Sequence, residues 1–232
     1  MKYGAGMRLI SLSHVNDPAT TSVFPGDPEF RLETVATIER DGYLLRAVSQ
    51  GEHTGTHWGA PGHFNAGEPL ADELSVEDLY MPAVCVDLRD RCAGDPDYAV
   101  TVDDLTAWES AHGRIPPGAM VIIRTGWSAR WGTPAFGTRH PGFAVETVRW
   151  LIDTGRLART GGTGTEAFSP DRGGDQSYAV SKLVYREHRI SLECLTNLEA
   201  LPPNGFHVLC GGTINRGGSG SPALIFALLP AG

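Results

Sequence analysis

Three histidines lie within eleven residues of this chain, between positions 53 and 63. Gly55 and Pro61, which stand between these histidines, oppose a helix through the segment. In an extended segment, residues an even number of positions apart project from the same face. His53, His57 and His63 share this parity, so we expect their imidazoles to converge on one pocket. Clustered imidazoles can bind a metal ion or move protons near neutral pH.

The run resembles the signature of the cyclase family, which includes bacterial kynurenine formamidases and isatin hydrolases and reads His-x-Gly-Thr-His-x-Asp-x-Pro-x-His. Every fixed position of the signature matches except the Asp, which is Gly59 here. Further matches follow along nearly the whole chain, at residues 24–27, 124–127, 164–171, 193–198 and 217–222. Glu166 stands where the family usually has an Asp. By this resemblance the chain is identified as a divergent member of the family.

The resemblance implies an α/β fold, a single-domain swivelling β/β/α arrangement with a curved central sheet and flanking helices, over residues 1–232. A chain of 232 residues also fits one domain better than two. Short apolar runs bounded by Gly or Pro predict strands at residues 84–88, 119–124, 206–210 and 223–228. Helices between such strands favour a mixed α/β architecture.

Capping residues and glycines predict two helices and two loops. Thr101 is a suitable N-cap for a helix over residues 101–112, and a second helix is expected over residues 143–154. The glycine-rich stretches 161–165 and 217–221 are predicted to be tight loops. The second stretch could also cradle an anion through its backbone N–H groups, although it lacks the lysine of a P-loop.

The resemblance also implies metal ligands. It assigns His53, His57 and Glu193 to one metal ion, and two imidazoles with one carboxylate form a set that can bind catalytic zinc or manganese. A second ion would need the Asp replaced by Gly59 and a His whose place Ser181 takes, so we expect no second ion. The same two departures favour an alternative of equal weight, a pocket that works without any metal. The sequence therefore leaves open whether each chain binds one Zn or Mn ion or no ion.

The family's general acid/base falls on His63, and we expect His63 and Glu193 to be the catalytic residues. Phe24, Trp58 and Ser181 are expected to contact the substrate, two as apolar walls and Ser181 in the place of the family's histidine.

The expected function is hydrolysis of an amide, lactam or lactone, or the related cyclisation, of a small carbonyl compound by histidine acid/base chemistry. Two alternatives stay open: a metal-free cyclase, dehydratase or isomerase of specialised metabolism, and a non-catalytic ligand-binding relative. Gly59 would leave space where the family has a carboxylate, which would admit a larger substrate. Kynurenine formamidase activity itself is not expected, because the family's two-metal site is dismantled.

The formal net charge of −8 and the absence of a Lys/Arg-rich stripe argue against a nucleic acid or an anionic membrane as partner and favour a small-molecule substrate. We see neither a signal peptide nor an apolar run of ~18 residues, and expect a cytoplasmic protein. The family forms dimers or tetramers, which implies a homodimer or homotetramer. The four cysteines lack Cys-x-x-Cys spacing and are interpreted as buried structural thiols, with a nucleophilic Cys194 as the alternative.

Overall fold

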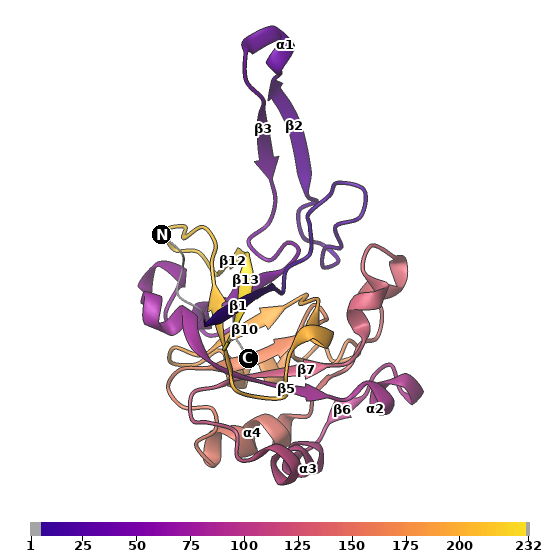
Figure 1. Ribbon diagram of the computed structural model, residues 1–232, viewed down its shortest axis with the longest axis vertical. Helices are drawn as coiled ribbons and strands as arrows, with labels where there is room; N and C mark the ends of the chain where they lie inside the picture. Colours follow the sequence, from indigo (N-terminus) through magenta and orange to yellow (C-terminus); the bar gives the residue numbers. More distant parts are fainter. Residues whose placement is uncertain (1–5, 231–232) are drawn as a thin grey trace.

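A computed structural model describes residues 6–230 of the chain. In this range a sheet of nine strands curls around one core, helices cover its other face, and a two-stranded hairpin projects away from it (Figure 1). The strands of the large sheet are β1 (Met7–Ser11), β4 (His57–Gly59), β5 (Tyr80–Asp87), β7 (Met120–Arg124), β9 (Gly162–Thr165), β10 (Ile190–Glu193), β11 (Phe206–Cys210), β12 (Gly220–Pro222) and β13 (Ile225–Pro230).

The α-helices are α1 (Ile38–Asp41), α2 (Arg89–Gly94), α3 (Val102–His112), α4 (Val145–Asp153) and α5 (Ala179–Val184). Short 3₁₀ helices span Pro61–His63, Ala71–Glu73, Val76–Leu79, Trp127–Arg130, Pro134–Gly137 and Leu198–Ala200. Two small sheets pair β2 (Arg31–Ala36) with β3 (Leu45–Ser49) and β6 (Ala99–Val100) with β8 (Gly142–Phe143). Among residues 6–230, no helix has both the length and the apolar character that a membrane crossing requires.

The parallel part of the large sheet lies at its centre. The strand order is β1-β13-β11-β5-β7-β9-β10-β4-β12, in which the neighbours β5, β7, β9 and β10 run parallel. The crossovers between these parallel strands contain α3, α4 and α5. Open α/β sheets commonly bind ligands beyond the carboxyl ends of their parallel strands. Here β10 ends at Glu193, one of the predicted site residues.

Alternate residues of the central strands contribute to two separate cores. Along β7, Met120 and Ile122 pack into the core inside the curled sheet, whereas Val121 and Ile123 pack against the helices. Successive side chains of a strand point to opposite faces, so a strand covered on both sides must be apolar at every position. This explains why β7 reads as a continuous apolar run.

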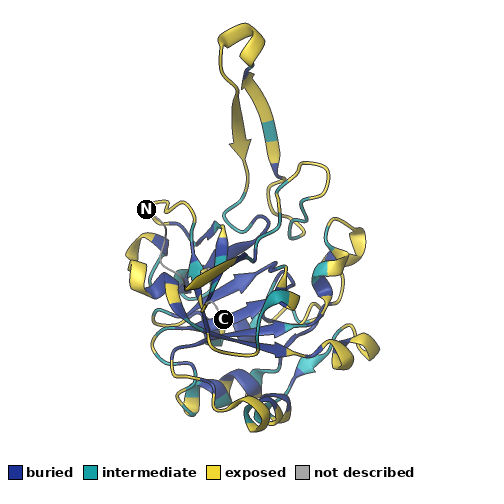
Figure 2. Ribbon diagram, in the orientation of Figure 1, coloured by how far each residue is buried: buried dark blue, intermediate teal, exposed yellow. Residues whose placement is uncertain are grey.

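The β2–β3 hairpin, with α1 at its tip, stands out from the molecule and is exposed along most of its length (Figures 1 and 2). Several of its apolar side chains are at least 47% exposed: Val35, Ile38, Tyr43, Leu44, Leu45 and Val48. A two-stranded hairpin is only marginally stable by itself in water.

The predicted architecture is confirmed in its main points. The sheet is curved, the fold is mixed α/β, and strand 206–210 coincides with β11. The helix predicted over residues 101–112 is α3, with Thr101 as its N-cap. The helix predicted over residues 143–154 is shorter, because Phe143 belongs to β8 and α4 begins at Val145.

The prediction of a loop at residues 161–165 is wrong, since this stretch contains β9, a buried strand at the centre of the sheet. Its glycines allow close packing between β7 and β10. Gly162 has a φ of 154°, and a Cβ there would run into the backbone of Ile190. Glycine in a strand can mark such a close backbone approach. The second glycine-rich stretch is a loop only up to Ser219, because β12 begins at Gly220.

Candidate active site

The register between β4 and β10 places two predicted site residues side by side. His57 and Glu193 are direct partners across this antiparallel pair, so their side chains share one face of the sheet. On the other face, Trp58 pairs with Leu192 and packs into the core inside the curled sheet. Strand alternation therefore determines which residues of β4 reach the site.

His53 and His63 join His57 at the same cavity, so the predicted convergence of the three imidazoles is confirmed. The predicted extended segment is wrong, because only residues 57–59 form a strand and residues 61–63 form a 3₁₀ helix. The rings of His53 and His63 stack with their centroids 3.9 Å apart. The turns on either side of β4, rather than parity along one strand, bring the rings together.

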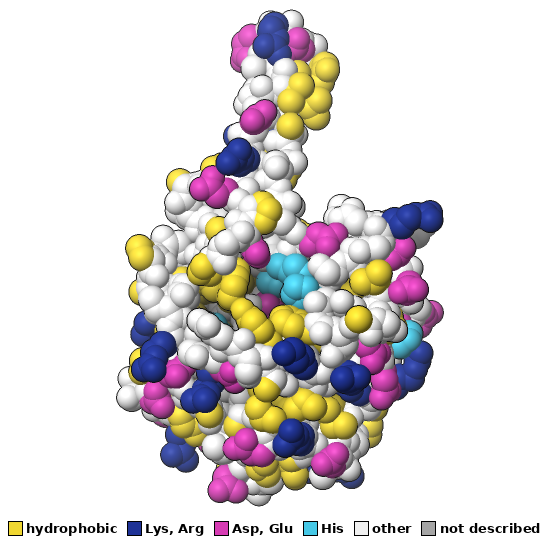
Figure 3. Space-filling model, turned by 180° about the vertical axis from the view of Figure 1, so that it is seen from behind, with side chains coloured by type: hydrophobic (Ala, Val, Ile, Leu, Met, Phe, Trp, Pro, Cys, Tyr) yellow, Lys and Arg dark blue, Asp and Glu magenta, His cyan; other side chains and the backbone are white. Residues whose placement is uncertain are grey.

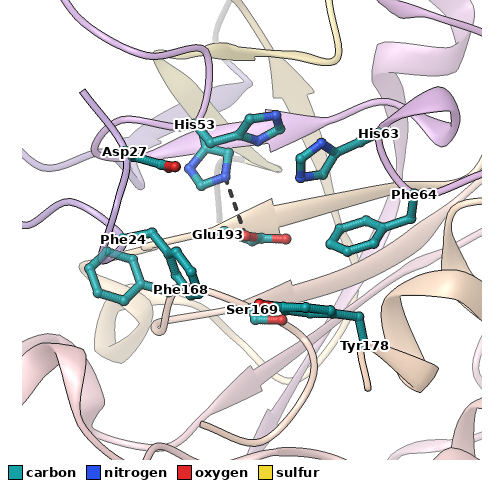
Figure 4. A pocket seen from close by; sticks show the side chains of 10 residues that line it. Phe24, Asp27, His53, His63, Phe64, Phe168, Ser169, Tyr178 and Glu193 are labelled. Carbon is teal, nitrogen blue, oxygen red and sulfur yellow. Dashed lines mark ion pairs between the residues drawn. The ribbon is translucent and has the colours of Figure 1, made fainter. Parts of the chain in front are cut away.

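The three histidines line a cavity of about 300 Å³, here called the inner cavity. From the side opposite to Figure 1, histidine side chains are visible in a hollow below the hairpin (Figure 3). The inner cavity is lined by Phe24, Asp27, His53, His57, His63, Phe64, Phe168, Ser169, Tyr178 and Glu193. In Figure 4, Phe24 and Phe168 lie at one end and Phe64 and Tyr178 at the other, with the polar groups between them. Aromatic ends around a polar centre suit a flat carbonyl compound.

His57 presents an unpartnered nitrogen to Glu193. Its Nδ1 donates to the carbonyl oxygen of Gly55 at 2.9 Å, because a carbonyl can only accept. Its Nε2 lies 3.2 Å from Oε2 of Glu193, within ion-pair distance but without an aligned hydrogen bond. Both residues are at most 6% exposed. Nε2 of His57 is thus a buried nitrogen without a hydrogen-bond partner among the described residues.

His53 is held by a chain of hydrogen bonds outside the inner cavity. Its Nε2 lies 2.9 Å from Oγ of Ser219, and this hydroxyl donates to Glu52 at 2.9 Å. The hydroxyl has one proton, so His53 is the donor to Ser219. Burial, with repulsion from His57 and His63, lowers the pKa of His53 to about 2. His53 is therefore a neutral ring.

The loop that holds His53 is the second glycine-rich stretch. Its Ser219 backbone N–H donates to Glu52 at 2.8 Å, and its Gly217 N–H donates to Asp72 at 2.9 Å. The N–H groups predicted to cradle an anion thus donate to carboxylates of the chain itself. These contacts support the interpretation of residues 217–221 as a structural loop rather than an anion site.

The pKa of His63 is lowered, mainly by burial, and also by the neighbouring His57. The charges of Glu193, Asp27 and Glu52 act in the opposite direction and favour its protonated form. A neutral imidazole surrounded by carboxylates can accept a proton and then stabilise the resulting cation. His63 thus has the environment of a general base.

The predicted metal trio does not form a ligand set in the structure. Residues 6–230 contain no group of three or more His, Cys, Asp or Glu side chains that could hold a metal ion. His57 and Glu193 present acceptor atoms to a common space, but Nε2 of His53 is bound to Ser219. Three protein ligands and an open position are typical of a catalytic zinc site. In the structure, His53, His57 and Glu193 are not gathered into such a set.

Two of the predicted substrate contacts are wrong. Trp58 is fully buried, and its Nε1 donates to the carbonyl oxygen of Gly211 on the core side of β4. Ser181, in the first turn of α5, is also fully buried, and its hydroxyl and N–H both donate to Asp171. Neither residue lines the inner cavity. Phe24, the third predicted contact, does line it.

The space expected above Gly59 is filled by Tyr185. A Cβ on Gly59 would lie 2.8 Å from Cζ and 2.9 Å from Cε1 of Tyr185, and closer still to its hydroxyl oxygen. That hydroxyl donates to Oε1 of Glu193 at 2.9 Å. The expectation that Gly59 admits a larger substrate is therefore wrong, because a buried phenol takes up the room.

Several lining residues were not predicted from the sequence. Asp27 was noted only as part of a matching turn, and Phe168 and Ser169 only as part of a matching segment. Phe64 directly follows the histidine run, so its position was a usable signal. Tyr178 gave no signal, because it reaches the inner cavity from the turn before α5, far along the chain.

Cys194 and Glu166 have structural roles. All four cysteines are free and buried, as expected. Burial raises the pKa of the Cys194 thiol well above its ordinary value, which keeps it protonated and argues against a nucleophile. Glu166 accepts hydrogen bonds from the backbone N–H groups of Thr125 and Gly126, both at 2.6 Å, and from Oγ of Ser128. It holds the segment after β7 in place.

A second, more polar cavity of about 490 Å³ adjoins the first and is here called the outer cavity. It shares Phe24, Phe168, Ser169 and Tyr178 with the inner cavity. Its other lining residues are Pro25, Gly137, Thr138, His140, Arg172, Gly173, Asp175 and Gln176. The two cavities together form a space with an aromatic, histidine-lined inner part and a polar outer part.

Comparison with known proteins gives a consistent result. The "Putative cyclase" family model matches residues 10–172. Isatin hydrolase from Roseibium aggregatum is 29% identical over 220 residues, which cover 88% of this chain and 82% of the relative. The structure of isatin hydrolase A from Ralstonia solanacearum is 33% identical, with a TM-score of 0.88 over 96% of this chain and 92% of that chain. A structure described as a potential metal-dependent hydrolase with cyclase activity is 22% identical, with a TM-score of 0.72 over 96% and 98% of the two chains, a likeness of fold alone.

Proposed function

The chain is an enzyme of the "Putative cyclase" family, and from this membership we propose that it hydrolyses a ring amide or ring ester of a small aromatic carbonyl compound. The observation that carries the proposal is the inner cavity, where neutral His63 lies between carboxylates and aromatic walls. The relatives named isatin hydrolase act, by that name, on a lactam fused to an aromatic ring. A flat substrate of this class would fit between the aromatic ends of the cavity.

In the proposed reaction, His63 transfers a proton from water to the leaving atom. The water oxygen bonds to the carbonyl carbon while its proton passes to a ring nitrogen of His63. The imidazolium then gives this proton to the leaving nitrogen or oxygen as the ring C–N or C–O bond breaks. Glu193 and Asp27 supply the negative charge that stabilises the transient cation.

The outer cavity supports a substrate that is longer than the reacting ring. Arg172 and Gln176 line it, and they could bind a polar or acidic group beyond the aromatic part. We therefore propose a substrate with an aromatic carbonyl end in the inner cavity and a polar extension in the outer one.

A second candidate is cyclisation or dehydration by the same acid/base residue without a metal ion. The observation that favours it is Tyr185, whose ring fills the side-chain space of Gly59 and whose hydroxyl binds Glu193. The change in substrate mass separates the two candidates, because hydrolysis adds one water and cyclisation with dehydration removes one.

The experiment that tests the proposal is incubation of the full chain with a panel of aromatic lactams and lactones, isatin included, followed by mass spectrometry. Hydrolysis adds the mass of one water, and we expect a His63→Ala variant to lose about 10²–10⁴-fold in rate. His207→Ala, a change at an exposed histidine on β11, is the matched control. Full activity in His63→Ala, or tight binding without turnover by the wild type, would contradict the proposal.

We further propose that the chain works as a homo-oligomer, a dimer or tetramer. The exposed apolar side chains of the β2–β3 hairpin support this, because a second copy of the chain would cover them.

A further inference from the structure

Tyr185 and Gly59 form a matched pair at the centre of the site. Gly59 lies opposite Ser191 on β10, on the face that carries His57 and Glu193. Tyr185 caps the end of α5 and is fully buried, with its ring stacked on Phe64 at 5.4 Å between centroids. Any side chain at position 59 would collide with the phenol ring as well as with its hydroxyl. Residue 59 is therefore a glycine because Tyr185 occupies its side-chain space.

The Tyr185 hydroxyl also determines how Glu193 can be used. It donates to Oε1 at 2.9 Å, while Oε2 faces Nε2 of His57 at 3.2 Å. Both oxygens of the carboxylate thus have protein neighbours. A carboxylate can only accept, so the phenol hydroxyl is the donor in this bond. The hydrogen bond from Tyr185 fixes Oε1, and Oε2 remains without a hydrogen bond beside His57.

The hydrogen bonds of the two histidines leave one nitrogen of each ring as an acceptor. Nδ1 of His57 donates to the carbonyl oxygen of Gly55, and Nε2 of His53 donates to the Ser219 hydroxyl. What this site lacks is therefore a carboxylate at position 59, not ring nitrogens. The resemblance to the family placed a carboxylate at residue 59, where this chain has the tyrosine ring.

From these contacts we infer that Tyr185 takes the place of a metal-ligating carboxylate, and that its hydrogen bond to Glu193, rather than an ion, orients the carboxylate at this centre. Tyr185 is a positioning residue, since it acts through Glu193 and does not line the inner cavity. The inference concerns the site of the proposed function and refines it, but its first test requires no substrate.

The first test is metal binding by the full chain after treatment with a chelator, with Mn²⁺ or Zn²⁺ added back, measured by calorimetry and by elemental analysis after dialysis. We expect the wild type to retain far less than one ion per chain. The double variant Gly59→Asp/Tyr185→Ser removes the ring and introduces a carboxylate beside His57. It should retain about one ion per chain, and addition of His57→Ala should abolish that binding.

Either of two results would overturn the inference. One is a wild-type chain that retains about one ion and loses it in His57→Ala. The other is a folded double variant that binds no more metal than the wild type, since position 59 would then not decide metal binding. Gly59→Asp alone should melt at a lower temperature than the double variant, which checks that the clash with Tyr185 is real.

The second test uses a substrate identified for the enzyme and compares Tyr185→Phe with Tyr98→Phe. Each change removes one hydroxyl that donates to a carboxylate, and Tyr98 donates to Asp104 at 2.8 Å, outside the inner cavity. We expect Tyr185→Phe to lower kcat roughly 10- to 100-fold with KM little changed, and Tyr98→Phe to leave both unchanged. Wild-type kcat in Tyr185→Phe would overturn the positioning role. Absence of turnover in the wild type would contradict the proposed function alone, because the metal measurements are independent of it.

Discussion

At the scale of single residues, burial and neighbouring charge decide what the histidines of this site can do. His53 and His63 stack on each other, yet only His63 has carboxylate charges that favour its protonated form. For His53 the causes of the pKa shift all act in one direction and lower its pKa to about 2. The difference assigns proton transfer to His63 and a structural role to His53.

This difference predicts the pH dependence of the rate. Because the pKa of His63 is lowered from 6.5, its neutral form persists below pH 6.5. A general base acts in this form, so kcat/KM should stay level as the pH falls past 6.5 and should decline only through the lowered pKa. A pH–rate profile of the free enzyme on a slow substrate measures this. A decline centred above pH 6.5 would contradict the assignment.

Trp58 and Phe168 give opposite predictions although both are large aromatic residues. Trp58 is fully buried in the core, so Trp58→Ala should cost about 3–5 kcal/mol in the free energy of unfolding and leave KM nearly unchanged for the folded fraction. Phe168 lines both cavities, so Phe168→Ala should raise KM. Denaturant unfolding and steady-state kinetics on the two variants check this. A clear rise in KM in Trp58→Ala would instead support the predicted contact of Trp58 with the substrate.

At the scale of elements, the ends of the strands are held together by a buried carboxylate. Glu166 follows β9, is 2% exposed, and binds the backbone of Thr125 and Gly126 after β7. The parallel strands β7 and β9 therefore end at a fixed distance from each other. The same loop continues to Phe168 and Ser169, which line both cavities.

Removal of this carboxylate should destabilise the fold and loosen the site. Glu166→Ala leaves several buried donors without an acceptor, and we expect a loss of roughly 2–4 kcal/mol in the free energy of unfolding. Glu166→Gln, which keeps one acceptor oxygen, should lose less. Chemical denaturation of both variants, with the exposed change Glu39→Gln as control, measures the effect. If Glu166→Ala is as stable as the control, the hydrogen bonds of Glu166 make no net contribution to the free energy of unfolding.

At the scale of the whole molecule, the hairpin projects from the body with its apolar side chains exposed. The central strands of the large sheet are covered on both faces, whereas Ile38 and Leu44 are 65% and 61% exposed. The hairpin leaves the body close to the residues that form the inner cavity, since β3 ends at Ser49 and His53 follows. Assembly through the hairpin would therefore affect the position of residues that line the inner cavity.

The oligomer is tested by introducing a charge on the hairpin. We expect the wild type to elute as a dimer or tetramer in size-exclusion chromatography with light scattering, and Leu44→Asp to shift it toward monomer without loss of secondary structure. Leu224→Asp, at a comparably exposed position (51%) outside the hairpin, should leave the assembly unchanged. A wild type that is monomeric at all concentrations would contradict the proposed assembly.

The sequence by itself determined the family, through the histidine run and the matching segments, and the mixed α/β fold, through local apolar patterns. The meeting of Glu193 with the three histidines was implied by the resemblance to the family. It misjudged β9, because glycines that permit close strand packing resemble the glycines of a loop. It also misplaced Trp58 and Ser181, since strand register and buried hydrogen bonds, not side-chain type, decide which residues reach a cavity.

Only the tertiary structure showed that Tyr185 fills the space above Gly59. Those two residues are far apart in the chain, and their contact follows from the way α5 packs beside β10 and β4. A missing carboxylate is visible in a sequence, whereas the group that replaces it is visible only where the chain folds back on itself.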